Sequence, residues 1–147
     1  MIGRRAAVVA LIVACLAPSA FADQPAFAEG QVWSLSDPEH ASTRVRIGRI
    51  EDSGRTIHIS LWGARTPAPL QSMMGTTLVM QHLPITDQAL RASVSMIVTE
   101  TPPADLGFET GYQIWRDDQG GVFTLTVPEI IEAMVHTIAN GQASPTK

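Results

Sequence analysis

Alternating hydrophobic and polar positions predict two neighbouring β-strands early in the chain. In residues 44–47 the hydrophobic side chains occupy every second position, and residues 56–62 repeat this pattern. The segment 51–55 between them has the composition of a tight turn, so we expect a β-hairpin. Continuing the phase of the first strand would turn Arg49 inward, so we expect a β-bulge at Gly48.

Three further segments have the composition of strands, namely residues 30–35, 76–83 and 122–126. Within the second of these, His82 shares the parity of Leu78 and Met80. We therefore expect His82 to be a hydrogen-bonded, partly buried histidine on the inward face.

Helical spacing of apolar residues predicts three helices in the second half of the chain. The first begins at the N-cap Thr86 and carries an apolar stripe as far as Val98, the second covers about 106–116, and the third covers 126–141. Strands early and helices late predict an α+β fold. We expect a mostly antiparallel sheet of four to five strands with about three helices packed on one face.

Residues 1–22 have the three parts of a secretory signal peptide: two arginines, an apolar run over 6–16, and a small-x-small cleavage site that ends at Ala22. We therefore expect export to the periplasm or out of the cell. The apolar run is shorter than the about 20 residues of a membrane-spanning helix, and no later segment comes closer to that length, so no transmembrane segment is predicted.

Cys15 leaves a second interpretation open. Residues 12–15 resemble a bacterial lipobox, in which the cysteine becomes the lipidated first residue of the mature protein. The segment before Cys15 is unusually short for this, and a plain signal peptide is therefore favoured. Cleavage after Ala22 would remove the single cysteine of the chain and with it any disulfide, thiolate nucleophile or cysteine metal site.

The rest of the chain has the length of one domain. We expect a flexible leader over 23–29, a single α+β domain over 30–141 and a disordered tail over 142–147. The formal net charge is −4. It becomes −6 once the two signal-peptide arginines are removed, since 8 basic residues then face 14 acidic ones. This acidic balance argues against nucleic acid as a partner.

The sequence carries no Gly-x-Ser-x-Gly, no phosphate-binding glycine loop, no dinucleotide fingerprint and no His-x-His or His-Glu-x-x-His motif. We therefore assign no catalytic residue, no metal site and no cofactor. Two alternatives stay open. One is a small hydrolase with His58 or His82 as base and Ser60 or Ser72 as nucleophile. The other is a small-ligand carrier with a pocket lined by Trp33, Met73 and Trp115.

One face of the predicted hairpin combines residue types that are common in protein interfaces. Its outward side chains are Arg44, Arg46, His58, Ser60 and Trp62. Arginine and tryptophan anchor many interfaces because they offer large contact area and directional bonding. We therefore expect a non-catalytic binding protein, such as an inhibitor, an immunity-type protein or an accessory subunit, with a protein partner at this face.

Five short segments together resemble a group of small uncharacterised bacterial proteins. The segments are Gly30-Gln31-Val32-Trp33, Ile57-His58-Ile59-Ser60, His82-Leu83-Pro84, Tyr112-Gln113-Ile114-Trp115 and Gly121-Val122-Phe123-Thr124. The resemblance spans most of the mature chain and implies a single self-contained domain. It implies no activity and no functional residue.

Overall fold

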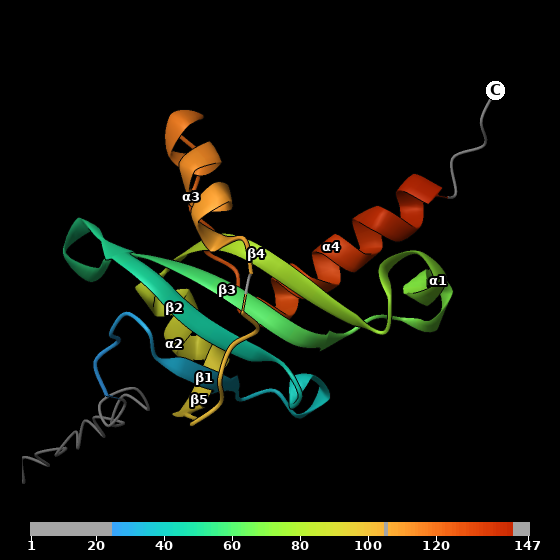
Figure 1. Cartoon of the computed structure of the whole chain (residues 1–147), viewed down its shortest axis with the longest axis horizontal. Helices are drawn as coiled ribbons and strands as arrows, with labels where there is room; N and C mark the ends of the chain where they lie inside the picture. The colour runs from blue at the N-terminus through green and yellow to red at the C-terminus, as the bar shows by residue number, and fades with distance from the viewer. Residues whose placement is uncertain (1–24, 105, 143–147) are drawn as a thin grey trace, which may run out of the picture.

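A five-stranded antiparallel sheet in the order β4-β3-β2-β1-β5 organises the protein, as the computed structural model shows for residues 25–104 and 106–142 (Figure 1). The strands are β1 (Val32–Leu35), β2 (Arg44–Glu51), β3 (Thr56–Arg65), β4 (Thr77–Thr86) and β5 (Val94–Ile97). The α-helices are α1 (Gln71–Met74), α2 (Asp87–Ser93), α3 (Phe108–Asp117) and α4 (Val127–Gln142). The predicted α+β class is confirmed, with one helix more than expected.

The predicted signal peptide, the alternative lipid site at Cys15 and residues 143–147 of the predicted tail lie outside the described residues. Among the described helices, none combines the length and the apolar character that crossing a membrane requires. Phe27, in the predicted leader, packs edge-on against Trp33 with ring centroids 5.2 Å apart.

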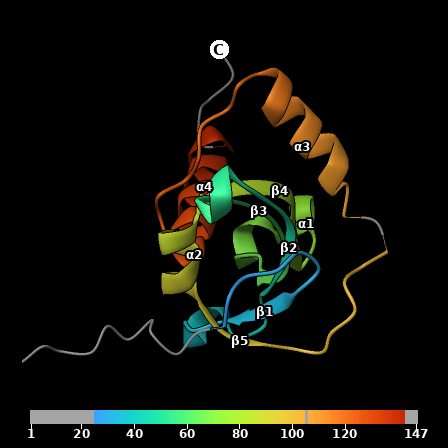
Figure 2. The same ribbon diagram turned by 90° about the vertical axis from the view of Figure 1, so that its left-hand side faces the viewer.

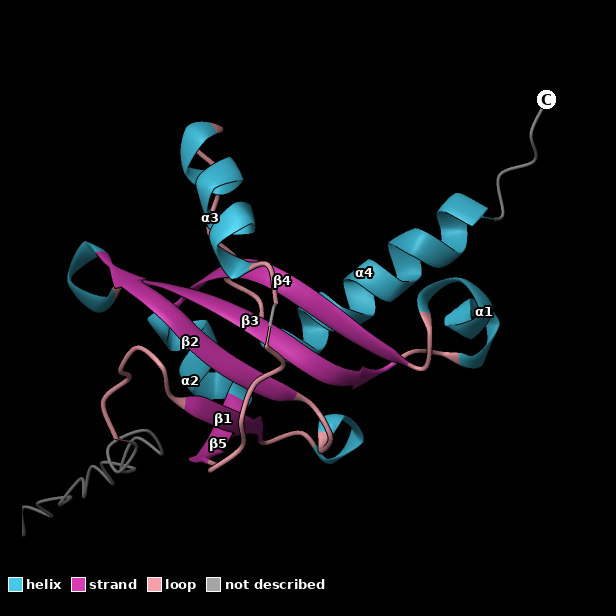
Figure 3. Cartoon of the chain, in the orientation of Figure 1, coloured by secondary structure: helices cyan, strands magenta, loops and turns pink. Residues whose placement is uncertain are grey.

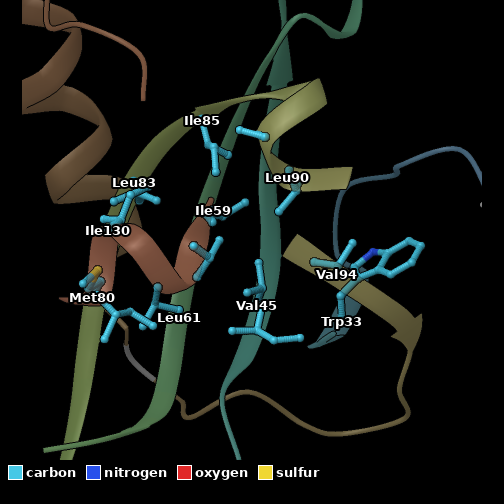
Figure 4. Close-up of a cluster of buried hydrophobic side chains, with 14 of the residues drawn as sticks. Trp33, Val45, Ile59, Leu61, Met80, Leu83, Ile85, Leu90, Val94 and Ile130 are labelled. Carbon is cyan, nitrogen blue, oxygen red and sulfur yellow. The ribbon is translucent and has the colours of Figure 1, made fainter. Parts of the chain in front are cut away.

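The main hydrophobic core covers one face of the sheet. The inward residues predicted for the hairpin strands are at most 1% exposed, and α2 and α4 pack onto them (Figure 4). The hairpin contributes Val45, Ile47, Ile57, Ile59 and Leu61, and the two helices contribute Leu90, Val127 and Ile130. Burial of each such side chain contributes about 1.5–3 kcal/mol, which makes this layer the principal source of stability.

The register of β2 against β3 confirms the bulge at Gly48. Ile47 pairs with Ile59, whereas Arg49 pairs with His58, so one residue of β2 has no partner. The extra residue lets Ile50 pack against the core. Arg49 is thereby kept on the opposite face, as the sequence pattern required.

The helix predicted through Val98 ends earlier, at Ser93, and the following residues form β5 on the outer side of β1. The buried Ser93 hydroxyl donates to the Ala89 carbonyl and accepts a hydrogen bond from the Val127 amide, which fixes the end of α2 against α4. The β-branched Val94 and Ile97 then pair with β1, because strand pairing outweighs helical spacing here.

The predicted last strand, residues 122–126, is reduced to a single parallel bridge. Phe123 donates its amide to the Pro84 carbonyl and accepts the Thr86 amide at the outer edge of β4. One half of the capping box predicted ahead of α4 is confirmed, since the Glu129 carboxylate accepts a hydrogen bond from the Thr126 amide. The Thr126 hydroxyl donates to the same carboxylate.

The position of α3 corrects the expectation that all helices pack on one face. Tyr112 and Trp115 of α3 contact His58, which points from β3 away from the main core. α3 thus lies on the side of the sheet opposite α2 and α4 (Figure 2). Residues 98–104, which follow β5, run along that same side (Figure 3). The second face carries aromatic and imidazole rings that also need cover, which explains the division of the helices.

Gly48 provides a test of this packing. A Cβ at this position would lie 2.4 Å from two ring atoms of Phe108 in α3. We expect Gly48→Ala to displace α3 and to lower the free energy of unfolding by about 1–3 kcal/mol in urea denaturation. Gly121→Ala is the control, because its Cβ would meet open space. Equal effects of the two substitutions would show that α3 does not press on β2.

Candidate functional site

Two histidines meet beneath α3. His58 on β3 is fully buried, and its Nδ1 lies 2.9 Å from Nε2 of His82 on β4. Tyr112 and Trp115 of α3 contact the His58 ring edge-on, with centroids 5.1 and 4.5 Å away. We call these four residues the histidine cluster. The cluster places two imidazoles between the sheet and an aromatic cover.

A register shift in β4 brings its histidine to the α3 side of the sheet. Ile59 pairs with Leu83, but Leu61 pairs with Met80, so β4 has one extra residue between the two pairs. The extra residue turns His82 away from the core face that Met80 and Leu83 share. The predicted hydrogen-bonded, partly buried state of His82 is found, but on the face opposite to the one its sequence parity indicated.

Glu51 of β2 lies at the far end of His58. Its Oε2 is 3.4 Å from His58 Nε2, and its Oε1 accepts a hydrogen bond from the Tyr112 hydroxyl. The Arg49 guanidinium lies over the Tyr112 ring, 4.0 Å from the ring centroid. A line of polar groups therefore runs from Tyr112 through Glu51 and His58 to His82.

Burial lowers the pKa of both histidines. For His58, loss of hydration outweighs the attraction of Glu51, and its pKa lies below the usual value. For His82, burial and, to a smaller extent, the neighbouring His58 lower the pKa to about 4. Both rings are therefore neutral at pH 7, so the cluster adds no positive charge to this part of the protein.

An apolar groove runs along the outer edge of β4. Among the described residues, five of the eight large apolar side chains that are exposed gather there: Val79, Ile114, Phe123, Leu125 and Met134. A cavity of about 520 Å³ lies between α3, β4 and α4, and His82 forms part of its wall. A second cavity of about 280 Å³ continues along α4. We call these two cavities the β4 groove.

The backbone edge of β4 is open over most of its length. In the described part of the chain, β3 flanks one side of β4, and Phe123 alone hydrogen-bonds its backbone from the other side. Residues 77–83 contain no acidic or basic side chain apart from the neutral His82. Charges, prolines and bulges usually protect edge strands from pairing with other chains. Here Pro84 lies at the end next to Phe123, one register shift falls at Gln81 and His82, and a second falls opposite Val79, while no charged side chain guards residues 77–83.

The face predicted for binding is largely covered. Arg44 pairs with Trp62 and Arg46 with Ser60, so these side chains share one face as expected. His58 and Ser60 are fully buried, however, which corrects their predicted exposure. Arg44 Nε donates to Glu100 in the loop before α3 at 2.7 Å. The other two predicted residues, Arg46 and Trp62, are half-buried. Their side chains form no hydrogen bond or ion pair with the described residues.

The described residues form neither the catalytic site of the predicted hydrolase alternative nor the pocket of the predicted carrier alternative. The Nδ1 atom of His58 contacts His82 rather than a hydroxyl, Ser60 Oγ is buried without a hydrogen-bond partner in the described part, and Ser72 is exposed on α1. Trp33 belongs to the main core whereas Trp115 lies on the opposite face, so the two do not line one pocket. The described residues contain no group of three potential ligands that could hold a metal ion.

Comparisons with protein-family models, with curated proteins and with solved structures find no match to this chain. The geometry of the histidine cluster and of the β4 groove is therefore the basis for a functional proposal.

The low pKa of His82 predicts that acid destabilises the protein. The unfolded chain binds a proton at His82 as the pH falls through about 6.5, whereas the folded protein binds it only near pH 4. Stability is therefore full above pH 6.5 and falls towards pH 4, with a contribution on the order of 1–2 kcal/mol from this residue.

Urea denaturation at pH 7 and pH 4.5 measures this dependence. We expect His82→Gln to reduce the difference in free energy of unfolding between the two pH values. His136→Gln, at an exposed position of α4, should leave that difference unchanged. A wild-type stability that does not fall between pH 6.5 and pH 4.5 would contradict the buried neutral state of His82.

Proposed function

We propose that this protein is a small, exported, non-catalytic binding protein that holds an extended segment of a partner protein in the β4 groove. The observation that carries the proposal is the gathering of exposed apolar side chains beside an open strand edge. Clustered apolar surface of this kind commonly marks a binding site, whereas single exposed apolar residues need no explanation. An open edge adds main-chain hydrogen bonds for a partner strand.

The chain itself illustrates the mode of binding. Phe123 lies beside β4, exchanges backbone hydrogen bonds with Pro84 and Thr86, and projects a large apolar side chain that both cavities share. A partner segment next to residues 77–83 would continue the same arrangement along the strand. Its backbone would pair with β4, and every second side chain would enter the groove.

The lining of the groove defines the partner's chemistry. The walls carry no Asp, Glu, Lys or Arg, so a charged side chain would lose its hydration there without gaining an ion pair. We therefore expect a segment with apolar residues at alternate positions. The two cavities meet at Phe123 and Met134, and this elongated form suits an extended chain better than a compact small molecule.

The Arg44 face supports partner binding less well. Arg44 is already paired with Glu100, and α3 covers His58 at the other end of that face. An incoming protein would have to replace the ion pair between Arg44 and Glu100. The described residues that line the β4 groove include no Asp, Glu, Lys or Arg, so no ion pair has to be broken there. For this reason we place the binding site at β4.

Selection from a displayed library of random peptides tests the proposal. We expect the purified protein to enrich peptides with alternating apolar residues. Val79→Lys and Met134→Lys should each weaken the binding of these peptides by roughly tenfold or more in isothermal titration calorimetry, because a charge is placed in the groove. Met96→Lys is the matched control, since Met96 is 61% exposed on β5 at the opposite edge of the sheet.

Peptides that carry backbone N-methyl groups separate strand pairing from simple apolar contact. Methylation of the amides directed at β4 should abolish binding, and methylation of the alternate amides should be tolerated. Failure to enrich any peptide, or equal binding by the Val79→Lys and Met96→Lys variants, would show that the β4 groove is not a binding site.

A further inference from the structure

His82 is a polar residue in the wall of an otherwise apolar cavity. It makes a hydrogen bond through Nε2 to His58. Its second ring nitrogen, Nδ1, forms no hydrogen bond with the described residues. This atom is also not fully buried. Nδ1 is therefore accessible, and the cavity that His82 lines adjoins β4, α3 and α4. A molecule in the β4 groove would meet His82, and Nδ1 is the ring nitrogen left for it because Nε2 is bonded to His58.

Glu51 determines which nitrogens of the two rings carry protons. Its carboxylate faces His58 Nε2 at 3.4 Å, and a lone pair on that buried nitrogen would be repelled by the carboxylate. The proton of neutral His58 therefore belongs on Nε2, which leaves Nδ1 as an acceptor. His82 Nε2, 2.9 Å away, must then donate to it. The remaining nitrogen, His82 Nδ1, consequently carries a lone pair.

The surroundings keep this arrangement in place. The Tyr112 hydroxyl donates to Glu51, and the Tyr112 ring also packs against His58, so α3 fixes both the carboxylate and the first imidazole. The Arg49 guanidinium over the Tyr112 ring places a positive charge near the Glu51 carboxylate. The neutral His82 ring is thus held in one tautomer.

We propose that His82 is the polar specificity residue of the β4 groove, where its Nδ1 accepts a hydrogen bond from an N–H group of the bound segment. This inference rests on the proposed binding function and names its main polar contact. A segment that presents an N–H group next to Nδ1 donates a hydrogen bond to it. A segment without that group would displace water from Nδ1 and leave the nitrogen without a hydrogen-bond donor, which weakens binding. Recognition of a donor by a buried acceptor discriminates more strongly than apolar contact does.

Imidazole ¹⁵N chemical shifts of the wild-type protein at pH 7 test the tautomer without any ligand. We expect both His58 and His82 to show a protonated Nε2 and an unprotonated Nδ1. Glu51→Gln removes the charge that fixes this order and should produce a mixture of tautomers in both rings. A protonated Nδ1 on His82 in the wild type would overturn the inference, because that atom would then donate.

Peptides enriched by the wild-type protein test the contact itself. His82→Phe keeps a ring of similar shape but removes the acceptor, and we expect it to weaken binding about fivefold to tenfold. The indole N–H group of Trp115 donates to the Gly121 carbonyl, and its signal in a ¹H–¹⁵N spectrum reports whether α3 is still in place in this variant. His136→Phe is the control, since His136 is exposed on α4 and does not line the groove.

The contact should also appear as a ligand-induced shift of His82 Nδ1 when peptide is added to the wild type, with little change at His58. N-methylation of one peptide amide should abolish that shift if the donor is a backbone group. Equal affinity of the wild type and His82→Phe, or an unchanged Nδ1 shift, would overturn the inference and leave the binding function standing. If no peptide binds the wild type, the binding function and this inference are both wrong.

Discussion

Two imidazole rings are enclosed on the second face of the sheet, and a buried polar ring costs free energy unless its nitrogens have partners. The groups next to these nitrogens come from three strands and one helix: Glu51 lies 3.4 Å from His58 Nε2, His58 Nδ1 and His82 Nε2 are 2.9 Å apart, and Tyr112 of α3 donates to Glu51. Within the described residues only the contact between the two rings is a hydrogen bond to a nitrogen of either ring, and His58 Nε2 has none. This requirement accounts for the register shift in β4, which turns its histidine to the α3 side of the sheet. It also accounts for the position of α3, which covers the face of the sheet opposite the main hydrophobic core.

The division of helices between the two faces leaves the edge of β4 uncovered. α3 is committed to the histidine cluster and α4 to the main core, and β4 forms the outer strand between them. Side chains that face neither layer, such as Ile114 on α3 and Met134 on α4, therefore meet over the strand edge with Val79. The β4 groove is thus a consequence of how the two faces are covered.

Local patterns in the sequence predicted the hairpin, the bulge at Gly48 and the contact of Glu129 with the Thr126 amide, because each depends on residues close together in the chain. The end of α2 was missed since Val94 fits a helical stripe as well as a strand, and pairing with the distant β1 decided between them. The face of His82 depended on a register shift relative to β3, which alternation within β4 does not reveal. Nor does any sequence pattern identify β4 as an edge strand, so the groove could not be predicted.

The chemistry of the histidine cluster bears on why polar groups are present there at all. Two apolar residues of similar volume could fill the space beneath α3, and replacement of both partners of a buried hydrogen bond by apolar groups is often nearly neutral for stability. The pair therefore adds little to the fold that leucine or phenylalanine would not provide. What it adds is an oriented acceptor at the wall of the β4 groove, held neutral by burial and fixed in direction by Glu51. An apolar groove distinguishes partners only weakly by size and shape, whereas one rigid acceptor inside it rejects segments without a matching donor. The cost of burying the histidines is thus understandable if the groove has to choose among extended segments.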